Sequence, residues 1–208
     1  MRILCLLRAW RLLEPLDQTA EEEARAAEEA DRILHEEINA LAKELIDISE
    51  KVKPAVYTTA SYKTLSTAVA KAKQLLADDT STAQQLREAR TQLLKARQAL
   101  KKKSANTLKV KGKTVKLKAK KLKKKAQTVK RAKAVTVSKP CGKVKYTLAG
   151  VSKAKFKKYF KVNAKTGKIT VKKRLKKGAY TVKIKVTAAG NGNYLPAAKT
   201  VKVIVKVK

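Results

Sequence analysis

Acidic residues are missing from the second half of this chain. Residues 101–208 contain 37 lysines and arginines and no aspartate or glutamate, whereas residues 1–100 hold 15 basic and 16 acidic residues. The formal charge of +36 therefore comes from the second half alone. So abrupt a change of composition indicates a domain boundary. It also removes from the basic half the paired acids that general acid–base catalysis needs.

Cysteine and histidine are scarce as well. Cys5 and Cys141 lie far apart in the sequence, which excludes a disulfide framework and favours two incidental thiols. His35, the only histidine, lies beside Leu34 on a predicted helix, where a solvated imidazole is expected rather than a metal ligand. Cys141 has neither a histidine nor an acid in its own half, so a cysteine nucleophile is not expected. We therefore predict that the chain is not an enzyme and has no catalytic or metal-binding residues.

Long apolar runs and clustered glycines are also absent. No segment reaches the roughly 18 apolar residues that cross a bilayer, and Ile3–Leu7 is shorter than the about 7 to 15 residues of a secretory signal core. The 7 glycines are scattered, and none has the spacing of a phosphate-binding loop. We expect no membrane span, no export signal within these residues and no cofactor.

The first half has the apolar spacing of amphipathic helices. From Ala20 to about Val52, apolar residues recur at alternating intervals of four and three after an acidic turn, Glu21–Glu23, which predicts one long helix. Beyond Pro54, Thr58–Thr59 can cap a second helix, and a turn over residues 78–81 offers caps for a third. The predicted apolar positions are Leu34, Ile38, Leu41, Leu45, Ile48 and Val52, then Tyr62, Leu65, Val69, Ala72 and Leu76, then Leu86, Ala89, Leu93, Ala96 and Leu100.

Three amphipathic helices joined by short turns can bury their apolar faces only against one another. We therefore predict a three-helix bundle over residues 20–103, after a short helical or irregular lead-in, residues 1–19, that the sequence does not place.

A motif within this region resembles a known family. The run Tyr57–Tyr62 is followed by Leu65, Ala68, Val69, Ala72 and Leu75–Asp78, and then by Thr82, Gln85, Leu86, Ala89, Leu93 and Ala96. This order is similar to that of the FIVAR module ("found in various architectures"), over about residues 34–101. FIVAR modules are helical bundles repeated in large secreted or wall-attached proteins of Gram-positive bacteria, beside glycoside hydrolases and adhesins. The resemblance implies an extracellular or cell-wall-associated protein.

In the basic half, lysines alternate with apolar residues. Thr181–Val186 reads Thr-Val-Lys-Ile-Lys-Val, and residues 114–118 and 199–203 alternate in the same way. Period two with β-branched residues indicates strands with one buried and one solvated face, so most lysines should point outward. We predict strands near residues 107–118, 128–137, 143–149, 159–163, 168–172, 179–188 and 198–207. About seven short strands predict an antiparallel β-sandwich over residues 104–208, and hence a multidomain chain, all-α plus all-β.

A second resemblance covers nearly the whole basic half. It is carried by Phe160–Asn163, Thr166–Val171, Leu175, Gly178, Tyr180–Val182 and Val186–Ala188. This order of motifs resembles bacterial cadherin-like and immunoglobulin-like (Ig-like) repeats, whose lysine-rich versions occur in surface proteins of clostridia and their relatives. Cadherins hold calcium with carboxylates between repeats. Because this half has no carboxylate side chain, calcium binding does not carry over.

The charge makes polyanions the obvious class of partner, because releasing condensed counterions drives binding. Nucleic acid is not expected as a specific partner, since arginine occurs in this half only as Arg131 and Arg174 and no recognition motif is present. Outward lysines suit loose attraction to teichoic acids, to other anionic wall polymers or to glycans, and they equally suit a purely solubilising role. The densest patch and candidate contact is Lys120, Lys121, Lys123, Lys124 and Lys125.

Together these features favour a non-catalytic pair of monomeric modules from an extracellular Gram-positive surface protein. Its role would be that of a spacer, or of an adhesion or cell-wall attachment element. Two alternatives stay open: a generic polyanion-binding or nucleic-acid-binding protein, and an accessory region of a secreted glycoside hydrolase.

Overall fold

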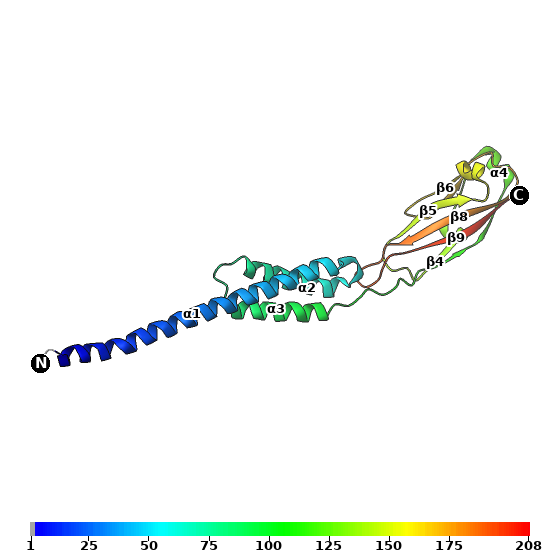
Figure 1. Cartoon of the computed structure of the whole chain (residues 1–208). Coiled ribbons are helices and arrows are strands. Elements are labelled where there is room, and N and C mark those ends of the chain that lie inside the picture. Colours follow the sequence, from blue (N-terminus) through cyan, green and yellow to red (C-terminus); the bar gives the residue numbers. More distant parts are fainter. Residues whose placement is uncertain (1–2) are drawn as a thin grey trace. The chain divides into compact units, whose positions relative to one another are not determined.

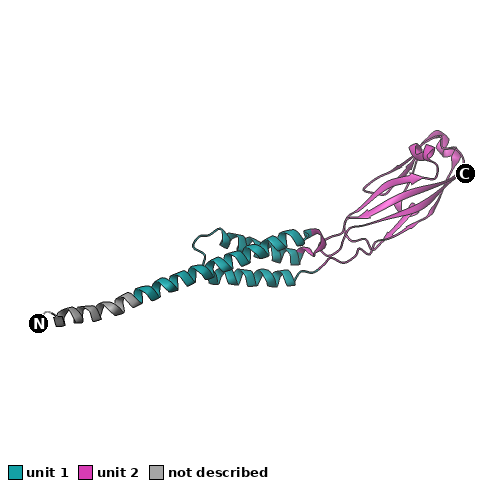
Figure 2. Cartoon of the chain, in the orientation of Figure 1, with its two compact units in different colours: residues 1–54, 60–101 teal, residues 55–59, 102–208 magenta. Residues whose placement is uncertain are grey.

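A computed structural model describes residues 3–208, with side chains from residue 19 onward. Figure 1 labels the elements, and Figure 2 shows the two compact units of the chain. The helical unit comprises the residues up to 54 and residues 60–101, and the β unit comprises residues 55–59 and 102–208. The segment 55–59 is held in the β unit by hydrogen bonds from Lys103 N to Val56 O (2.8 Å) and from Thr59 N to Gly192 O (2.9 Å). The fold is therefore all-α plus all-β.

The first helix is longer than its apolar pattern predicts. Helix α1 spans Ile3–Lys51, so residues 3–19 are part of it and the expected start near Ala20 is wrong. Glu21–Glu23 consequently lie inside the helix and not in its first turn. The residues before Ala20 are rich in leucine and arginine, which have high helix propensity and allow the helix to continue. Beyond α1, a single 3₁₀ turn covers Pro54–Val56.

Helices α2 (Thr59–Leu76) and α3 (Ala83–Gln98) complete the helical unit. The cap of α3 is Thr82 and not one of the preceding residues 78–81, which corrects the prediction. Gln85 N donates to Thr82 Oγ1 (3.3 Å), and Thr82 N donates to Gln85 Oε1 (2.8 Å), so two otherwise unpaired N–H groups are satisfied reciprocally. Asp78 closes the turn instead, because it accepts hydrogen bonds from Thr80 N (3.0 Å) and Thr80 Oγ1 (2.7 Å).

The predicted apolar faces of the three helices meet in one core. Its buried members are Leu41, Ile48, Leu65, Ala72, Leu86, Ala89, Leu93 and Ala96. The remaining predicted positions pack against this core except Tyr62, which lines a groove between α1 and α2. The helical spacing of the sequence therefore identified the core of this unit.

Charged side chains tie α1 to α3 beside that core. Glu37 is only 9% exposed and accepts from Arg87 Nε (3.0 Å) and from an Arg90 guanidinium nitrogen (3.1 Å). Two turns further along, Arg97 pairs with Glu44 and Asp47. These contacts join residues at least 50 positions apart in sequence, so they depend on the tertiary packing and not on one helix alone.

Nine strands build the β unit. They are β1 (Lys109–Gly112), β2 (Thr114–Leu117), β3 (Gln127–Val129), β4 (Val135–Ser138), β5 (Val144–Val151), β6 (Phe160–Val162), β7 (Ile169–Val171), β8 (Gly178–Ala188) and β9 (Ala197–Val207). Short helices α4 (Ala119–Lys124), α5 (Arg131–Ala134) and a 3₁₀ turn (Ala154–Tyr159) interrupt them. The sheets have the orders β2-β9-β8-β5, β3-β7-β6 and β1-β4, and their inner faces share one apolar core, as in a β-sandwich.

Two of the seven predicted strands are each split in two. Within residues 107–118, β1 pairs with β4 and β2 then pairs with β9, so the chain changes sheets at Gly112. A Cβ at Gly112 would lie 1.9 Å from Lys202 O, so only glycine allows this close approach. Within residues 128–137, helix α5 separates β3 from β4. A further correction concerns β2 and β9, which pair in parallel although the other ladders are antiparallel.

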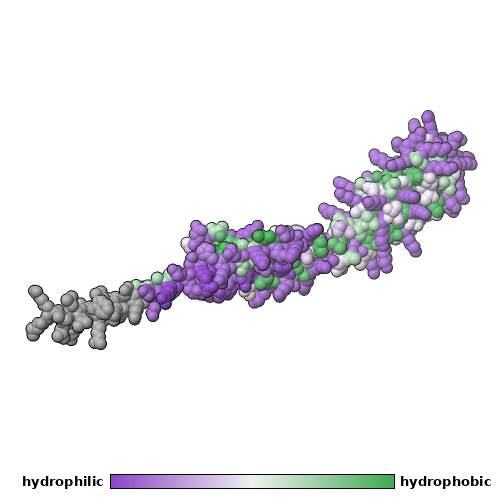
Figure 3. Space-filling model, in the orientation of Figure 1, coloured by the Kyte–Doolittle hydropathy of each residue, from purple (hydrophilic) through white to green (hydrophobic). Residues whose placement is uncertain are grey.

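The alternation of lysines and apolar residues is confirmed. In β8, Val182, Ile184 and Val186 are fully buried, while Lys183 and Lys185 between them are exposed. Most aromatic residues of this unit also contribute to the core: Tyr146, Phe160 and Tyr180 are buried, and Phe156 and Tyr159 pack against them, whereas Tyr194 is only half-buried. Figure 3 shows long hydrophilic side chains projecting from the β unit, with apolar surface between them.

Candidate polyanion-binding surface

The five lysines of the predicted patch gather on and just after α4. Ala119 and Leu122 bury one side of this helix, and its backbone is anchored by Arg174 N, which donates to Leu122 O (2.9 Å). Lys120, Lys121, Lys123, Lys124 and Lys125 are all exposed. Because α4 has a single anchored side, its lysines are spread over the remaining circumference and present charge without a shared focus.

A shallow hollow beside α4 collects further cations that the sequence reading missed. It has a volume of about 480 Å³, a floor of Ala119 and Leu175, and a rim of Lys123, Arg174, Lys176 and Lys177. The basic run 172–177 was the signal in the sequence that could have identified it. Arg174 has a φ of 69°, a left-handed conformation uncommon for any residue but glycine.

Tyr180 fixes the backbone of this rim. Its hydroxyl donates to Lys176 O (2.9 Å), and burial, followed by the neighbouring Tyr159, raises the pKa of Tyr180. Its ring packs edge-on against Phe156 at a centroid separation of 5.0 Å. The cationic rim therefore rests on the packed aromatic part of the core. The other arginine of this unit, Arg131, contacts the Tyr146 hydroxyl (3.4 Å).

The residues considered for catalysis and metal binding do not come together. His35 is exposed, and its Nδ1 lies 3.4 Å from Asp31 Oδ1 in the preceding helical turn. Cys141 lies in a turn of the β unit, where its backbone N donates to Asn106 Oδ1 (3.1 Å). Among the residues whose side chains the structure describes, no cluster of His, Cys, Asp or Glu could hold a metal ion. Cys5 lies outside those residues.

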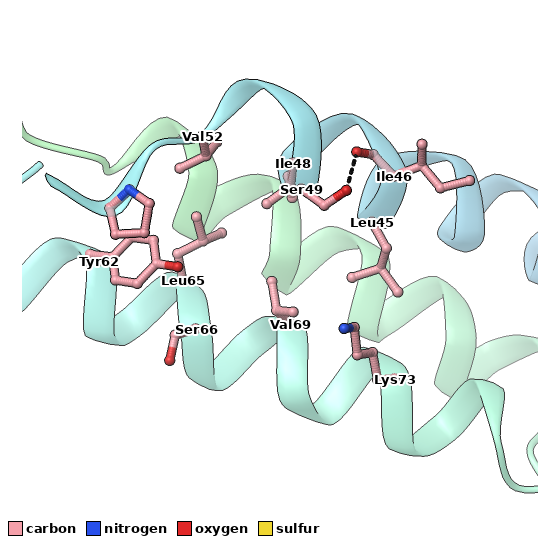
Figure 4. Close-up of a pocket in the computed structure, with 11 residues that line it drawn as sticks. Leu45, Ile46, Ile48, Ser49, Val52, Tyr62, Leu65, Ser66, Val69 and Lys73 are labelled. Carbon is pink, nitrogen blue, oxygen red and sulfur yellow. Dashed lines mark hydrogen bonds between the residues drawn. The ribbon is translucent and has the colours of Figure 1, made fainter. Parts of the chain in front are cut away.

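An apolar groove lies between α1 and α2 in the helical unit (Figure 4). It encloses about 490 Å³ and is lined largely by apolar residues, among them Leu45, Ile48, Leu65 and Val69. The Ser49 hydroxyl in its wall is already occupied, since it donates to Ile46 O (2.8 Å). Tyr62, Ser66 and Lys73 also line it, and all three come from α2, so the groove offers mainly hydrophobic contact.

In the described part of the chain, no helix has the length and apolar character to cross a membrane.

Comparison with known proteins gives weak structural likenesses only. No family model and no curated protein matches the chain. Among solved structures, the extracellular domain of protocadherin gamma-B4 shares 12% identity at a TM-score of 0.39, over 51% of this chain and 18% of that one. Mouse cadherin-23 EC22-24 shares 14% identity at a TM-score of 0.36, over 53% and 37% of the two chains. Drosophila N-cadherin EC1-4 shares 13% identity at a TM-score of 0.36, over 52% and 26%.

The matched region is therefore less than two fifths of the length of each of these cadherins. The strand pairings within this chain, and not these matches, establish the sandwich.

Proposed function

We propose that this chain is a non-catalytic pair of modules from an extracellular bacterial surface protein. In this proposal a FIVAR-type helical module and an Ig-like or cadherin-like β module act as a spacer that attaches loosely to anionic polymers of the cell wall. The α4 lysines and the neighbouring rim of Arg174, Lys176 and Lys177 are its candidate contacts.

One observation carries this proposal. Every lysine of the β unit is exposed except the half-buried Lys103, and the unit contains no carboxylate side chain that could neutralise them. A packed core holds these cations in place, so the unit presents a fixed positive surface. Such a surface attracts dense polyanions through counterion release, while lysine, a point charge, imposes little geometric selection on the anion.

Binding of the full-length chain to purified cell-wall sacculi tests the proposal. Sacculi are compared before and after chemical removal of their phosphate polymers, at about 0.15 M salt, with duplex DNA as competitor. We expect retention on intact sacculi, loss of retention after stripping, and little displacement by DNA. Equal retention on stripped sacculi would overturn the proposal. Displacement by DNA at equal phosphate concentration would favour a generic polyanion binder instead.

A further inference from the structure

The outer face of the four-stranded sheet carries lysines in a regular array, whereas the lysines of α4 are spread around a helix. We define the outer lysine face as Lys116 on β2, Lys202 and Lys206 on β9, Lys183 and Lys185 on β8, and Lys145 on β5. All six are exposed. The residues that alternate with them, such as Val115, Val182 and Val203, are buried in the core, so the strand period sets the direction of every lysine on this face.

The strand register places several of these lysines in direct opposition. Lys183 lies opposite Lys202, and Lys116 lies opposite Lys206. Directly opposed residues have their Cβ atoms about 5 Å apart, and alternate residues along a strand are about 7 Å apart. Like charges at this separation destabilise a sheet. Because the unit has no carboxylate side chain to offset them, binding of an external polyanion would relieve this repulsion.

Most of the remaining positions of the face hold short side chains, but Ile204, between Lys202 and Lys206 on β9, is a large apolar residue that is 38% exposed on the same face. Thr147 and Thr200 flank Lys185 across the sheet, and Gly150 lies opposite Lys183. A Cβ added at Gly150 would meet no atom within 4 Å, so the surface beside Lys183 is open. Around Lys183 and Lys185 the ammonium groups thus lie beside short side chains, so a polymer chain can approach several of them at once, while Ile204 adds an apolar contact between Lys202 and Lys206.

We infer that the outer lysine face binds a flexible, single-chain polyanion carrying phosphate groups along its length. This inference rests on the proposed function, and it places the main contact with the polyanion on the sheet instead of on α4. A flexible chain can follow the twisted strands and meet successive lysines. A stiff duplex, whose persistence length is about 50 nm, meets a twisted sheet along one line only. Lysine suits this ligand because it recognises a phosphate as a point charge and needs no bidentate geometry.

Three charge-matched variants of the full chain test the inference, with inorganic polyphosphate as the probe and duplex DNA as the comparison. The face variant is K183Q/K185Q/K202Q/K206Q. The α4 variant is K120Q/K121Q/K123Q/K124Q. The control variant, K153Q/K157Q/K161Q/K165Q, removes four exposed lysines elsewhere in the β unit. Fluorescence anisotropy gives each affinity and its dependence on salt.

We expect the face variant to lose at least about tenfold in polyphosphate affinity, and its slope of log K against log salt to fall by roughly 3. For the α4 variant and for the control variant, the fall in slope should be less than half of the fall seen in the face variant. Equal losses in all three variants would overturn the inference but leave the proposed function intact, because attraction would then depend on total charge. A larger loss in the α4 variant, or tighter binding of the wild type to duplex DNA than to polyphosphate, would also overturn it.

A fourth variant distinguishes a loss of binding caused by charge from one caused by misfolding. Thr114→Glu with Thr200→Glu keeps every lysine and adds carboxylates at exposed positions of the same face. Because it changes the charge of this face by two units and the face variant by four, it should weaken polyphosphate binding by about half as much on a logarithmic scale. Unchanged binding by this folded variant would contradict the inference, and circular dichroism checks the fold.

Discussion

Lys183 of β8 lies directly opposite Lys202 of β9 in the antiparallel ladder at the centre of the main sheet. Both side chains are exposed, and the unit contains no carboxylate side chain that could lie between them. Lys202→Glu replaces a repulsive pair by an attractive one. We expect this substitution to stabilise the β unit by about 0.5–1 kcal/mol at low salt, which corresponds to a rise of a few degrees in Tm.

Thermal unfolding at low and high salt measures this effect. Lys145→Glu is the matched control, because it lies on the same sheet face but opposite Thr187. Both substitutions change the net charge equally, so the difference between them reports the opposed pair. The gain from Lys202→Glu should shrink as salt screens the charges over a Debye length of about 10 Å or less. Equal gains from both variants would show that only the total charge matters.

Gly112 is required where the chain passes from the β1–β4 ladder to the β2–β9 ladder. In Gly112→Ala the added Cβ would lie 1.9 Å from Lys202 O, so β9 or the crossing strand must move. We expect a loss of about 1–3 kcal/mol in the free energy of unfolding, measured by urea denaturation. Gly150→Ala is the control, since its Cβ enters open space, and it should be neutral or slightly stabilising. Similar losses for both variants would contradict this account of the strand switch.

Glu37 stabilises the contact between α1 and α3. Glu37→Gln removes the charge that Arg87 and Arg90 share but keeps the length of the side chain. Because Glu37 is nearly buried while Arg87 is mostly exposed, we expect a loss of about 1–2 kcal/mol from the helical unit. Urea denaturation followed by the helical circular dichroism signal measures it. Glu36→Gln, at an exposed pair with Arg32, should change stability by less than about 0.5 kcal/mol.

Asp78 gives the helical unit a contribution to stability that depends on pH. Hydrogen bonds from the Thr80 side chain and then from its backbone N–H lower the pKa of Asp78. A carboxyl group whose pKa is lowered by folding stabilises the fold above its unfolded pKa of about 3.9 and loses that contribution as the pH falls through its folded pKa. We therefore expect the Tm difference between the wild type and Asp78→Ala to be present at neutral pH and to disappear in acid.

The neighbouring variant Asp79→Ala serves as the control for this pH series, since it changes the same turn without removing the acceptor of Thr80. A Tm difference for Asp78→Ala that stays constant from neutral to acid pH would show that the turn does not depend on the ionised carboxylate.

The sequence predicted what is repetitive in this fold. Period two along β8 and β9 located the core valines and the outward lysines, and helical spacing located Leu41, Leu65 and Leu93 in the bundle. The local sequence pattern could not predict features that depend on contacts with backbone far away in the sequence. The sheet change at Gly112 is imposed by Lys202, which lies 90 residues further along the chain. The parallel pairing of β2 with β9 has no local signal either.

The candidate binding surface was likewise predictable only where its residues are neighbours in sequence. Clustering in sequence identified the α4 lysines, which are neighbours along the chain. The outer lysine face was not predicted, because its lysines come from four strands that only the sheet order brings together. The cationic rim beside α4 was missed because residues 174–177 are distant in sequence from Lys123.

Chemical-shift mapping of the isotopically labelled chain, titrated with inorganic polyphosphate, tests the central claim most directly. The backbone amides and lysine side chains of β2, β5, β8 and β9 report on the outer lysine face, and those of α4 and β6 report on other exposed lysines. The account predicts saturable shifts concentrated at Lys183, Lys185, Lys202 and Lys206. Shifts spread evenly over all exposed lysines of the β unit, or the absence of any shift, would contradict it.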